Sequence, residues 1–245
     1  MVGSCAPTFS IIIPVLNEAS NLEGLLLSLQ KFRDAGVELI LADGGSSDDS
    51  VIVAKPLVTQ VVISETGRAT QMNAGAAKAS GDVLIFLHAD TQLSQSSIRT
   101  LAREWARQDR QWGRFDVRLS GKHFLFRVIE FMMNLRSKLT GIATGDQGIF
   151  VERALFVQLG GFANIPLMED VELSKRLKRY SKPICVNKPV TTSSRRWEEK
   201  GVVSTILLMW RLRLAYFLGC SPSALMARYY PERIEPAVQN LERAD

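Results

Sequence analysis

The chain has 245 residues, of which 46% are hydrophobic and 22% charged, and this is the composition of one globular domain with a full core. No uncharged apolar run reaches the roughly 18–20 residues that a membrane-spanning helix needs, so we expect no such helix. The net charge of +5 is uneven, with 5 basic and 10 acidic residues in 1–90 against 25 and 15 in 91–245. The basic residues are not interleaved with aromatic ones as in nucleic-acid-binding modules, so we expect no nucleic-acid partner.

Apolar runs and helical patterns alternate through the first 90 residues. We expect strands at residues 9–16, 37–42, 61–63 and 83–87, because each is a short apolar run. Helices are expected at residues 20–32, where Ser20 and Glu23 form a capping box, and at residues 69–79. A further helix is expected to open after the glycine turn at residues 43–48. This order predicts a parallel sheet with right-handed crossovers.

Three of these strands end in polar residues: Asn17 and Glu18, Asp43, and His88 with Asp90. In such sheets ligands bind beyond the carboxyl ends of the strands, so we expect these side chains to meet at one rim. His88 and Asp90 are two positions apart and would point the same way on an extended chain, where a divalent cation is a plausible shared ligand. For Asp43 alone, a simple turn-stabilising role is the alternative.

The pattern changes after residue 91. A helix at residues 94–107, a half-exposed strand at 114–119 and an apolar-rich helix at 124–139 are expected. A polar loop at 141–148, which holds Asp146 and Gln147, leads to a short strand at 149–151. Glu169 and Asp170 open a further helix. Helix capping is the alternative role for these two carboxylates, because the free N–H groups at a helix start favour negative charge.

Residues 202–218 form an apolar helix that is interrupted only by Arg211 and Arg213. It fits a core helix, a homodimer surface or an interfacial membrane helix, and the basic second part of the chain would suit anionic lipid or a metal–phosphate ligand. The three cysteines are scattered, and the sequence opens without a signal-peptide pattern. We therefore expect a cytoplasmic protein, with association with the inner face of the membrane as an option.

Four motifs stand in order along the chain. They are Ser10–Glu18 (SIIIPVLNE), Ala42–Asp48 (ADGGSSD), His88–Thr91 (HADT) and the pair Glu169–Asp170. Together they resemble the family 2 glycosyltransferases with the GT-A fold, and the Arg195–Trp197 segment is similar to an Arg-Trp element that some members carry after the catalytic core. The resemblance implies a Rossmann-like, mostly parallel α/β sheet flanked by helices over residues 1–198. It also implies a helical C-terminal extension at 199–245 that packs on the same domain.

The resemblance also implies a binding site for a nucleotide-diphospho-sugar. Pro14 and Val15 would contact the base and ribose, Glu18 and Asp43 would accept hydrogen bonds from them, and Arg68 would reach the same pocket. Arg195 and Arg196 would neutralise the diphosphate. In full, the residues implied in nucleotide-sugar binding are Pro14, Val15, Asn17, Glu18, Asp43, Arg68, His88, Ala89, Asp90, Asp146, Gln147, Arg195 and Arg196.

Members of this family use a DxD-type motif to hold a divalent metal, Mg²⁺ or Mn²⁺, that stabilises the leaving diphosphate. This chain has His88 in place of the first Asp, so Asp90 is the implied metal ligand. His88 could ligate Mn²⁺ but is a poor partner for Mg²⁺, and a contact beside the metal site without ligation is favoured for it, with contact to the ribose or simple packing also open. Asp170 matches the base that deprotonates the acceptor in inverting members, with Glu169 as the alternative or as its orienting partner.

The sequence therefore predicts an inverting glycosyltransferase that moves a sugar, from a UDP-sugar by preference, to an acceptor hydroxyl or phosphate. A lipid-like acceptor is one option, since residues 202–218 suit a membrane surface. The alternative is a non-catalytic module that binds a nucleotide, a nucleotide-sugar or a lipid on the same fold. A nucleotidyltransferase is disfavoured because Pro14–Glu18 offers neither a glycine-rich loop nor a Lys.

Overall fold

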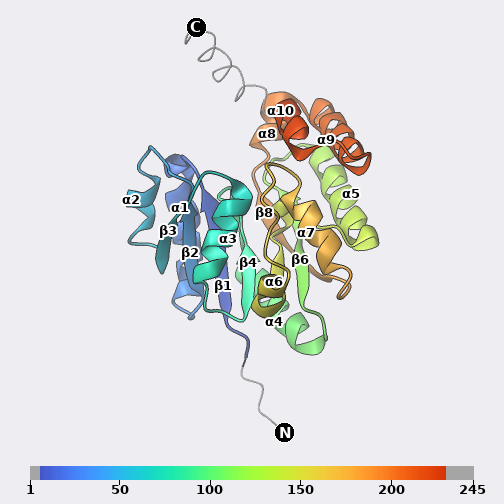
Figure 1. Ribbon diagram of the computed structural model, residues 1–245. Helices are drawn as coiled ribbons and strands as arrows, with labels where there is room; N and C mark the ends of the chain where they lie inside the picture. The colour runs from blue at the N-terminus through green and yellow to red at the C-terminus, as the bar shows by residue number, and fades with distance from the viewer. Residues whose placement is uncertain (1–5, 230–245) are drawn as a thin grey trace. The chain divides into compact units, whose positions relative to one another are not determined.

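The computed structural model describes residues 6–229 (Figure 1), and the chain forms two compact units. Among the described residues, the first unit consists of those up to 164 together with 170–194, and the second of 165–169 together with those from 195 onward. Residues 230–245 of the expected C-terminal extension lie outside the described residues.

The first unit is built on one eight-stranded sheet with the strand order β3-β2-β1-β4-β7-β6-β8-β5. Neighbouring strands pair in parallel, except that β7 is antiparallel to β4 and β6, and β5 is antiparallel to β8. The sheet is thus mostly parallel, as expected. Its strands are β1 (Phe9–Val15), β2 (Glu38–Asp43), β3 (Gln60–Ile63), β4 (Val83–Phe86), β5 (Thr91–Gln92), β6 (Trp112–Leu119), β7 (Phe150–Glu152) and β8 (Ile184–Thr192).

Helices cover both faces of this sheet (Figure 1). α1 (Ala19–Arg33) and α4 (Gln95–Arg107) pack on one face, and α3 (Arg68–Lys78), α6 (Arg153–Gln158) and α7 (Glu169–Leu177) pack on the other. The remaining helices of the first unit are the short α2 (Ser50–Ala54), α5 (Phe124–Thr140) and the 3₁₀ turn η1 (Gly145–Gln147). This two-faced cover explains why β4 is a continuous apolar run and why β1 is apolar except at Ser10.

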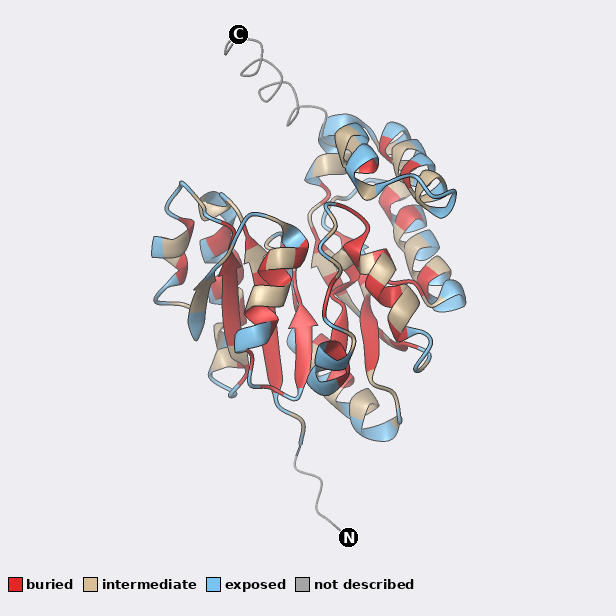
Figure 2. Ribbon diagram, viewed as in Figure 1, coloured by how far each residue is buried: buried red, intermediate tan, exposed pale blue. Residues whose placement is uncertain are grey.

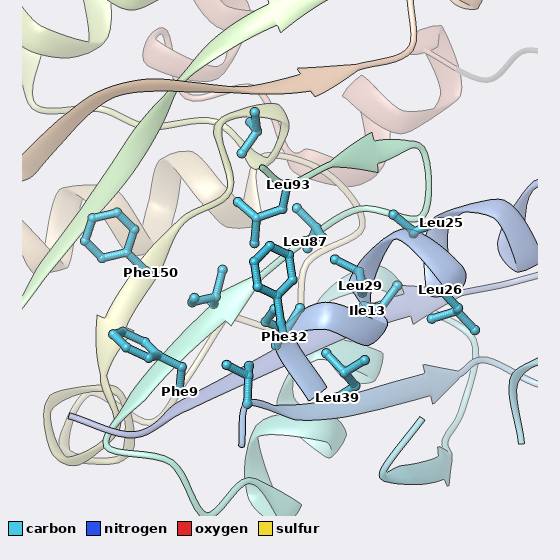
Figure 3. Packing of buried hydrophobic residues seen from close by; sticks show 14 of the residues in the cluster. Phe9, Ile13, Leu25, Leu26, Leu29, Phe32, Leu39, Leu87, Leu93 and Phe150 are labelled. Carbon is cyan, nitrogen blue, oxygen red and sulfur yellow. The ribbon is translucent and has the colours of Figure 1, made fainter. Parts of the chain in front are cut away.

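Alternate residues of the central strands face the two sides of the sheet. Ile11 and Ile13 of β1 pack with the α1 side, Ile12 packs with the α3 side, and all three are fully buried. Figure 2 shows the central strands as buried, and Figure 3 shows Ile13 among Leu29 and Phe32 of α1. The core therefore holds the carboxyl ends of β1, β2 and β4 at one edge of the sheet.

No apolar alternation in the sequence predicts β8, which is nine residues long. The reason lies at Asn187, Lys188 and Pro189, where β8 departs from regular pairing: Val186 pairs with Phe115, but the next paired residue is Val190, opposite Val117. Since Pro has no backbone N–H to donate, Pro189 is tolerated only where the ladder is interrupted. This bulge breaks the apolar alternation that would have indicated a strand.

The predicted capping box at Ser20 and Glu23 is wrong. α1 begins at Ala19, and Ser20 and Glu23 lie within its first turns. The loop after β2 supplies the cap instead, because the Ala19 N–H donates to Asp48 Oδ2 at 3.0 Å. A side chain distant in sequence has thus replaced the local one.

The second unit is helical, with α8 (Arg195–Lys200), α9 (Val202–Phe217) and α10 (Pro222–Tyr229). Within it, the Arg196 guanidinium lies 3.7 Å from the centroid of the Tyr229 ring and donates to the Tyr229 carbonyl at 3.2 Å. No helix among residues 6–229 is both long enough and apolar enough to cross a bilayer.

Candidate active site

Two loops at the carboxyl ends of β1 and β2 are joined side by side. The Asn17 N–H donates to Ser46 Oγ at 2.9 Å, and the Ser47 N–H donates to Asn17 Oδ1 at 2.8 Å. Asn17 has a φ of 55°, in the left-handed region that Asn tolerates better than most residues. The Glu18 N–H donates to Ser50 Oγ at 2.9 Å. These bonds fix the edge of the sheet on which the predicted nucleotide pocket lies.

Asp43 holds the second of these loops from within. It is 1% exposed, and its Oδ2 accepts the N–H groups of Gly45 and Ser46, each at 2.9 Å. Its Oδ1 accepts the Ser46 hydroxyl at 2.5 Å. A carboxylate offers about four acceptor positions, so one remains on Oδ1. The turn-stabilising role is therefore present, and a role in ligand binding stays a prediction.

Gln71 of α3 is a positioning residue that the sequence did not reveal. It is 4% exposed, and its Nε2 donates to the carbonyls of Val15 at 2.6 Å and Ala42 at 3.0 Å. A Cβ on Gly44 would lie 2.9 Å from the Gln71 amide carbon, so the glycine makes room for it. The amide thus ties together the carboxyl ends of β1 and β2. Its position on the apolar side of α3, next to Ala69 and Met72, was the one available signal.

The His88 ring lies just past β4 and packs against the η1 turn. Its side chain is 14% exposed, and its Nδ1 is 3.9 Å from Asp146 Oδ1. A Cβ on Gly145 would overlap Cε1 and Nε2 of the ring, so only glycine leaves room for the ring there. The close approach of His88 to residues 145 and 146 joins two motifs that are far apart in the sequence.

His88 is held in its neutral form. Burial, followed by the positive charge of Arg68, lowers the pKa of His88 from 6.5 to about 4. The carboxylates of Asp90 and Asp170 raise the pKa of His88, but this effect is smaller than that of burial and Arg68. At neutral pH the ring therefore carries no charge and has one nitrogen with a lone pair. The same interactions show that Arg68, Asp90 and Asp170 lie around it.

Asp90 is exposed at the rim and oriented by neighbouring hydroxyls. Its Oδ1 accepts from Thr91 Oγ1 at 3.2 Å and from Thr192 Oγ1 at 3.5 Å. Its backbone carbonyl accepts the Ser193 N–H at 3.1 Å, which holds the turn against the end of β8. The carboxylate therefore lies beside the end of β8 and retains acceptor positions toward solvent. Ala89 between the two polar residues is half-buried against the core.

Asp170 stands near the start of α7 and reaches the η1 turn. Its Oδ2 accepts the Gly145 N–H at 2.8 Å, and its Oδ1 accepts the Val171 N–H at 2.6 Å. The helix-terminus role that was the alternative is thus present. The bond to Gly145 adds a link from α7 to the turn that carries Asp146, and it brings Asp170 beside His88.

Gln147 lies inside the protein and not in an open pocket. It is fully buried; its Oε1 accepts the Thr144 N–H at 3.2 Å, and its Nε2 donates to Asn134 Oδ1 at 3.3 Å. Asn134 also accepts the Val117 N–H at 2.9 Å. This polar network ties the η1 turn to α5 and β6, and the sequence did not reveal Asn134. Asp146, in contrast, has a 46% exposed side chain.

The first unit thus brings together His88, Asp90, Asp146, Asp170 and Arg68, whereas the Asn17–Asp43 loops form a separate part of the same edge. Pro14 is half-buried and Val15 is buried at the end of β1. Glu169, Arg195 and Arg196 belong to the second unit. Glu169 is 3% exposed, and the Arg196 side chain is engaged with Tyr229.

The donor atoms at the rim fit a divalent cation that takes most of its ligands from elsewhere. Among residues 6–229 there is no group of three or more His, Cys, Asp or Glu side chains that could hold a metal ion. Asp90 provides one exposed carboxylate, and the neutral His88 provides one imidazole nitrogen nearby. Such a set suits an ion whose other ligands are diphosphate oxygens and water, and an imidazole suits Mn²⁺ better than Mg²⁺.

Comparison with protein families and curated proteins gives a consistent result. The family model described as "Glycosyl transferase family 2" matches residues 10–155. The PGL/p-HBAD biosynthesis glycosyltransferase of Mycobacterium bovis (strain BCG / Pasteur 1173P2) is 29% identical over 250 residues, which cover 95% of this chain and 94% of the relative. The undecaprenyl-phosphate 4-deoxy-4-formamido-L-arabinose transferase of Sodalis glossinidius is 29% identical over 150 residues, which cover 57% of this chain and 46% of the relative.

Solved structures agree on the fold. Glucosyl-3-phosphoglycerate synthase from Mycobacterium tuberculosis, in complex with Mn²⁺, UDP and glucosyl-3-phosphoglycerate, matches with a TM-score of 0.58 and 20% identity. The match covers 92% of this chain and 79% of the synthase. The predicted GT-A fold is confirmed by this likeness, and the predicted family is confirmed by the family model.

Proposed function

The chain belongs to glycosyltransferase family 2, and from that premise we propose that it is an inverting, metal-dependent enzyme that transfers a sugar from a UDP-sugar to an acceptor. The observation that carries this proposal is the cluster of Asp90, Asp170 and neutral His88 at the carboxyl end of β4. One carboxylate there is exposed and suits a metal–diphosphate, and a second lies close by and suits a base.

The nucleotide-sugar donor is held at the two hydrogen-bonded loops that follow β1 and β2. The base and ribose bind beside Asn17 and Glu18, and Asp43 keeps the loop in shape with one acceptor position left on Oδ1. UDP is the first nucleotide to test because the synthase structure contains it. The diphosphate role expected of Arg195 and Arg196 stays a prediction, and the Arg196 guanidinium stacks on Tyr229.

Asp90 and His88 would hold the metal at the rim. When bound, a divalent ion neutralises the charge that develops on the leaving diphosphate. Thr91 and Thr192 orient the Asp90 carboxylate for this contact. Mn²⁺ is present in the synthase structure, and the donor set here suits the same ion.

Asp170 removes the proton of an acceptor hydroxyl as its oxygen attacks the anomeric carbon. Inversion is a single displacement, so no covalent nucleophile is needed. The Gly145 N–H fixes Oδ2 of Asp170, which sets the direction of the carboxylate. Glu169, the residue before it, is the orienting partner or the alternative base. A phosphate acceptor is already ionised and needs no base, so the two acceptor classes make different demands on Asp170.

A lipid-like acceptor is the finer part of the proposal. Two observations support it: the name of the Sodalis relative includes undecaprenyl phosphate, and α9 carries exposed apolar side chains. The match to this relative covers 46% of the relative's length, and a panel of hydroxyl and phosphate acceptors, lipid-linked and free, tests this part of the proposal.

Binding and turnover are measured separately in the test. UDP with Mn²⁺ is expected to raise the melting temperature, because a ligand that binds only the native state stabilises it. Turnover of UDP-sugars is expected to be lost in Asp90→Ala. In Asp170→Asn, turnover on hydroxyl acceptors should fall strongly while UDP binding is retained. Unchanged turnover of Asp170→Asn on a hydroxyl acceptor would exclude it as the base.

The alternative is a non-catalytic module that binds the nucleotide-sugar or a lipid. The observation in its favour is His88, since the motif has one carboxylate fewer than a DxD motif. Binding of UDP and Mn²⁺ without turnover across hydroxyl and phosphate acceptors would favour this alternative over the enzyme.

A further inference from the structure

α9 exposes an apolar face that is continuous along its whole length. The exposed side chains recur every three or four residues and lie within a sector of about 100° around the helix axis. We call this face the α9 stripe; it consists of Val203, Leu207, Trp210, Leu214, Phe217 and the following Leu218, each 47–77% exposed. On the opposite side, Thr205 and Leu212 are buried. α9 is therefore not a core helix, which was one of the three options for residues 202–218.

Two arginines border the stripe. At 100° per residue, Arg211 lies beyond one edge of the stripe and Arg213 beyond the other. The sequence Val202–Phe217 contains no Asp or Glu. From residue 195 to 229 the chain has six basic residues and two acidic ones. The stripe is thus an apolar band with positive charge on both sides.

This charge pattern discriminates between the two remaining partners. In a symmetric contact between two copies, Arg211 and Arg213 would meet the same arginines with no carboxylate on α9 to pair with them, which disfavours the contact. On an anionic lipid surface the leucines would be buried at the boundary of the acyl chains. The long arginine side chains would reach the negatively charged headgroups and pair with them. Trp210, near the middle of the stripe, is of a residue type enriched at membrane interfaces.

We propose that the α9 stripe docks on an anionic membrane surface, with the helix lying in the interface and not crossing it. Apolar area sets the depth of such a contact and anionic lipid adds to its strength. Docking requires neither donor nor metal, so this inference goes beyond the proposed glycosyl transfer and does not depend on it.

Flotation with lipid vesicles tests the proposal on the full chain. Vesicles of phosphatidylcholine with added phosphatidylglycerol are expected to carry the protein, and vesicles of phosphatidylcholine alone to carry much less. Leu214→Asp should weaken the binding about tenfold or more, because it places a charge where a leucine enters the interface. Arg211→Gln and Arg213→Gln should each weaken it about fivefold, and only with anionic vesicles.

Leu27→Asp is the matched control, since Leu27 of α1 is 54% exposed but stands outside the stripe. It should float like the unaltered protein. Circular dichroism and UDP binding are expected to be unchanged in Leu214→Asp, which separates membrane docking from loss of fold and from the donor site.

Three outcomes would overturn the proposal. The protein could stay in the soluble fraction with anionic vesicles. Leu214→Asp could float as well as the unaltered protein. Light scattering could show a dimer that Leu214→Asp dissociates, without vesicle binding, and the stripe would then be the contact between two copies. Loss of turnover with intact flotation would instead count only against the proposed enzyme.

Discussion

Replacing Gly145 with alanine tests the contact on which the arrangement of the candidate site depends. Gly145 does not have a positive φ, so alanine fits its backbone conformation. The added Cβ would overlap Cε1 and Nε2 of His88. Because the His88 side chain is 14% exposed, the ring has little room to move. The substitution therefore isolates one effect, the displacement of the ring from the η1 turn.

The size of the effect follows from overpacking. Forcing a methyl group into a well-packed position costs about 1–3 kcal/mol. For a chain of this length, each kcal/mol corresponds to a decrease of about 2–4 °C in Tm. Turnover should decrease further, because the Gly145 N–H also holds Asp170 Oδ2. A displacement of about 1 Å at reacting groups can reduce the rate about 100-fold.

Urea denaturation and steady-state kinetics measure the two effects. Gly24→Ala is the control, since a Cβ there meets nothing within 4 Å and the residue lies inside α1, where alanine is preferred. It should be neutral or stabilising. In a His88→Ala background the cost of Gly145→Ala should disappear, because the two changes are coupled through one contact. A stable, fully active Gly145→Ala protein, or an equal cost in both backgrounds, would refute the reasoning.

Three further predictions address other parts of the structure. In metal-free protein, the free energy of unfolding should fall by up to about 3 kcal/mol as the pH drops from 6.5 to 4. The reason is that His88 binds a proton in the unfolded chain over this range, whereas folding lowers its pKa to about 4. Denaturation at several pH values should show a smaller decline in His88→Asn, and an equal decline would contradict the lowered pKa of His88. Asn134→Ala should cost about 1–3 kcal/mol in chemical denaturation, since it leaves the buried Gln147 amide and the Val117 N–H without their partner, and no loss would count against this network. Phe131→Asp should change the free energy of unfolding by less than about 0.5 kcal/mol, because Phe131 on α5 is 63% exposed; a larger loss would mean that this face is covered by another surface.

The elements that could be predicted most readily from the sequence are the strands that are buried on both faces of the sheet. β1 and β4 are buried on both faces, so every position except Ser10 is apolar and the strands are evident from the sequence. β8 was missed because Asn187, Lys188 and Pro189 stand in its bulge, and the bulge is defined by pairing with β6 rather than by local sequence. The cap of α1 was wrong for a similar reason: Asp48 comes from another loop.

The same distinction holds for the candidate site. The position of Asp43, His88 and Asp90 at one edge follows from topology, because β1, β2 and β4 are parallel and place their carboxyl ends there. Asp170 comes from α7, and the Gly145 N–H that it accepts links it to this edge. Asn134 could not be recognised, since a polar residue on a helix is usually a surface residue, and for Gln71 the apolar side of α3 was the one signal. The role of these two side-chain amides is evident only from their buried partners, which are distant in sequence. These partners are the carbonyls of Val15 and Ala42 and the backbone N–H of Val117.

The neutral imidazole of His88 has an electrostatic consequence that can be measured by binding. A carboxylate in its place would add a negative charge beside Asp90 and Asp170, where the diphosphate would bind in the proposed function. At about 6 Å and an effective dielectric constant of about 20, one such charge repels another by about 3 kcal/mol, so the metal-free Kd for UDP should rise at least tenfold in His88→Asp. With saturating Mg²⁺ the loss should be largely recovered, because oxygen ligands suit this ion. Calorimetry with and without metal gives both values. Equal metal dependence in the two proteins would mean that His88 does not face the diphosphate and only packs against the η1 turn.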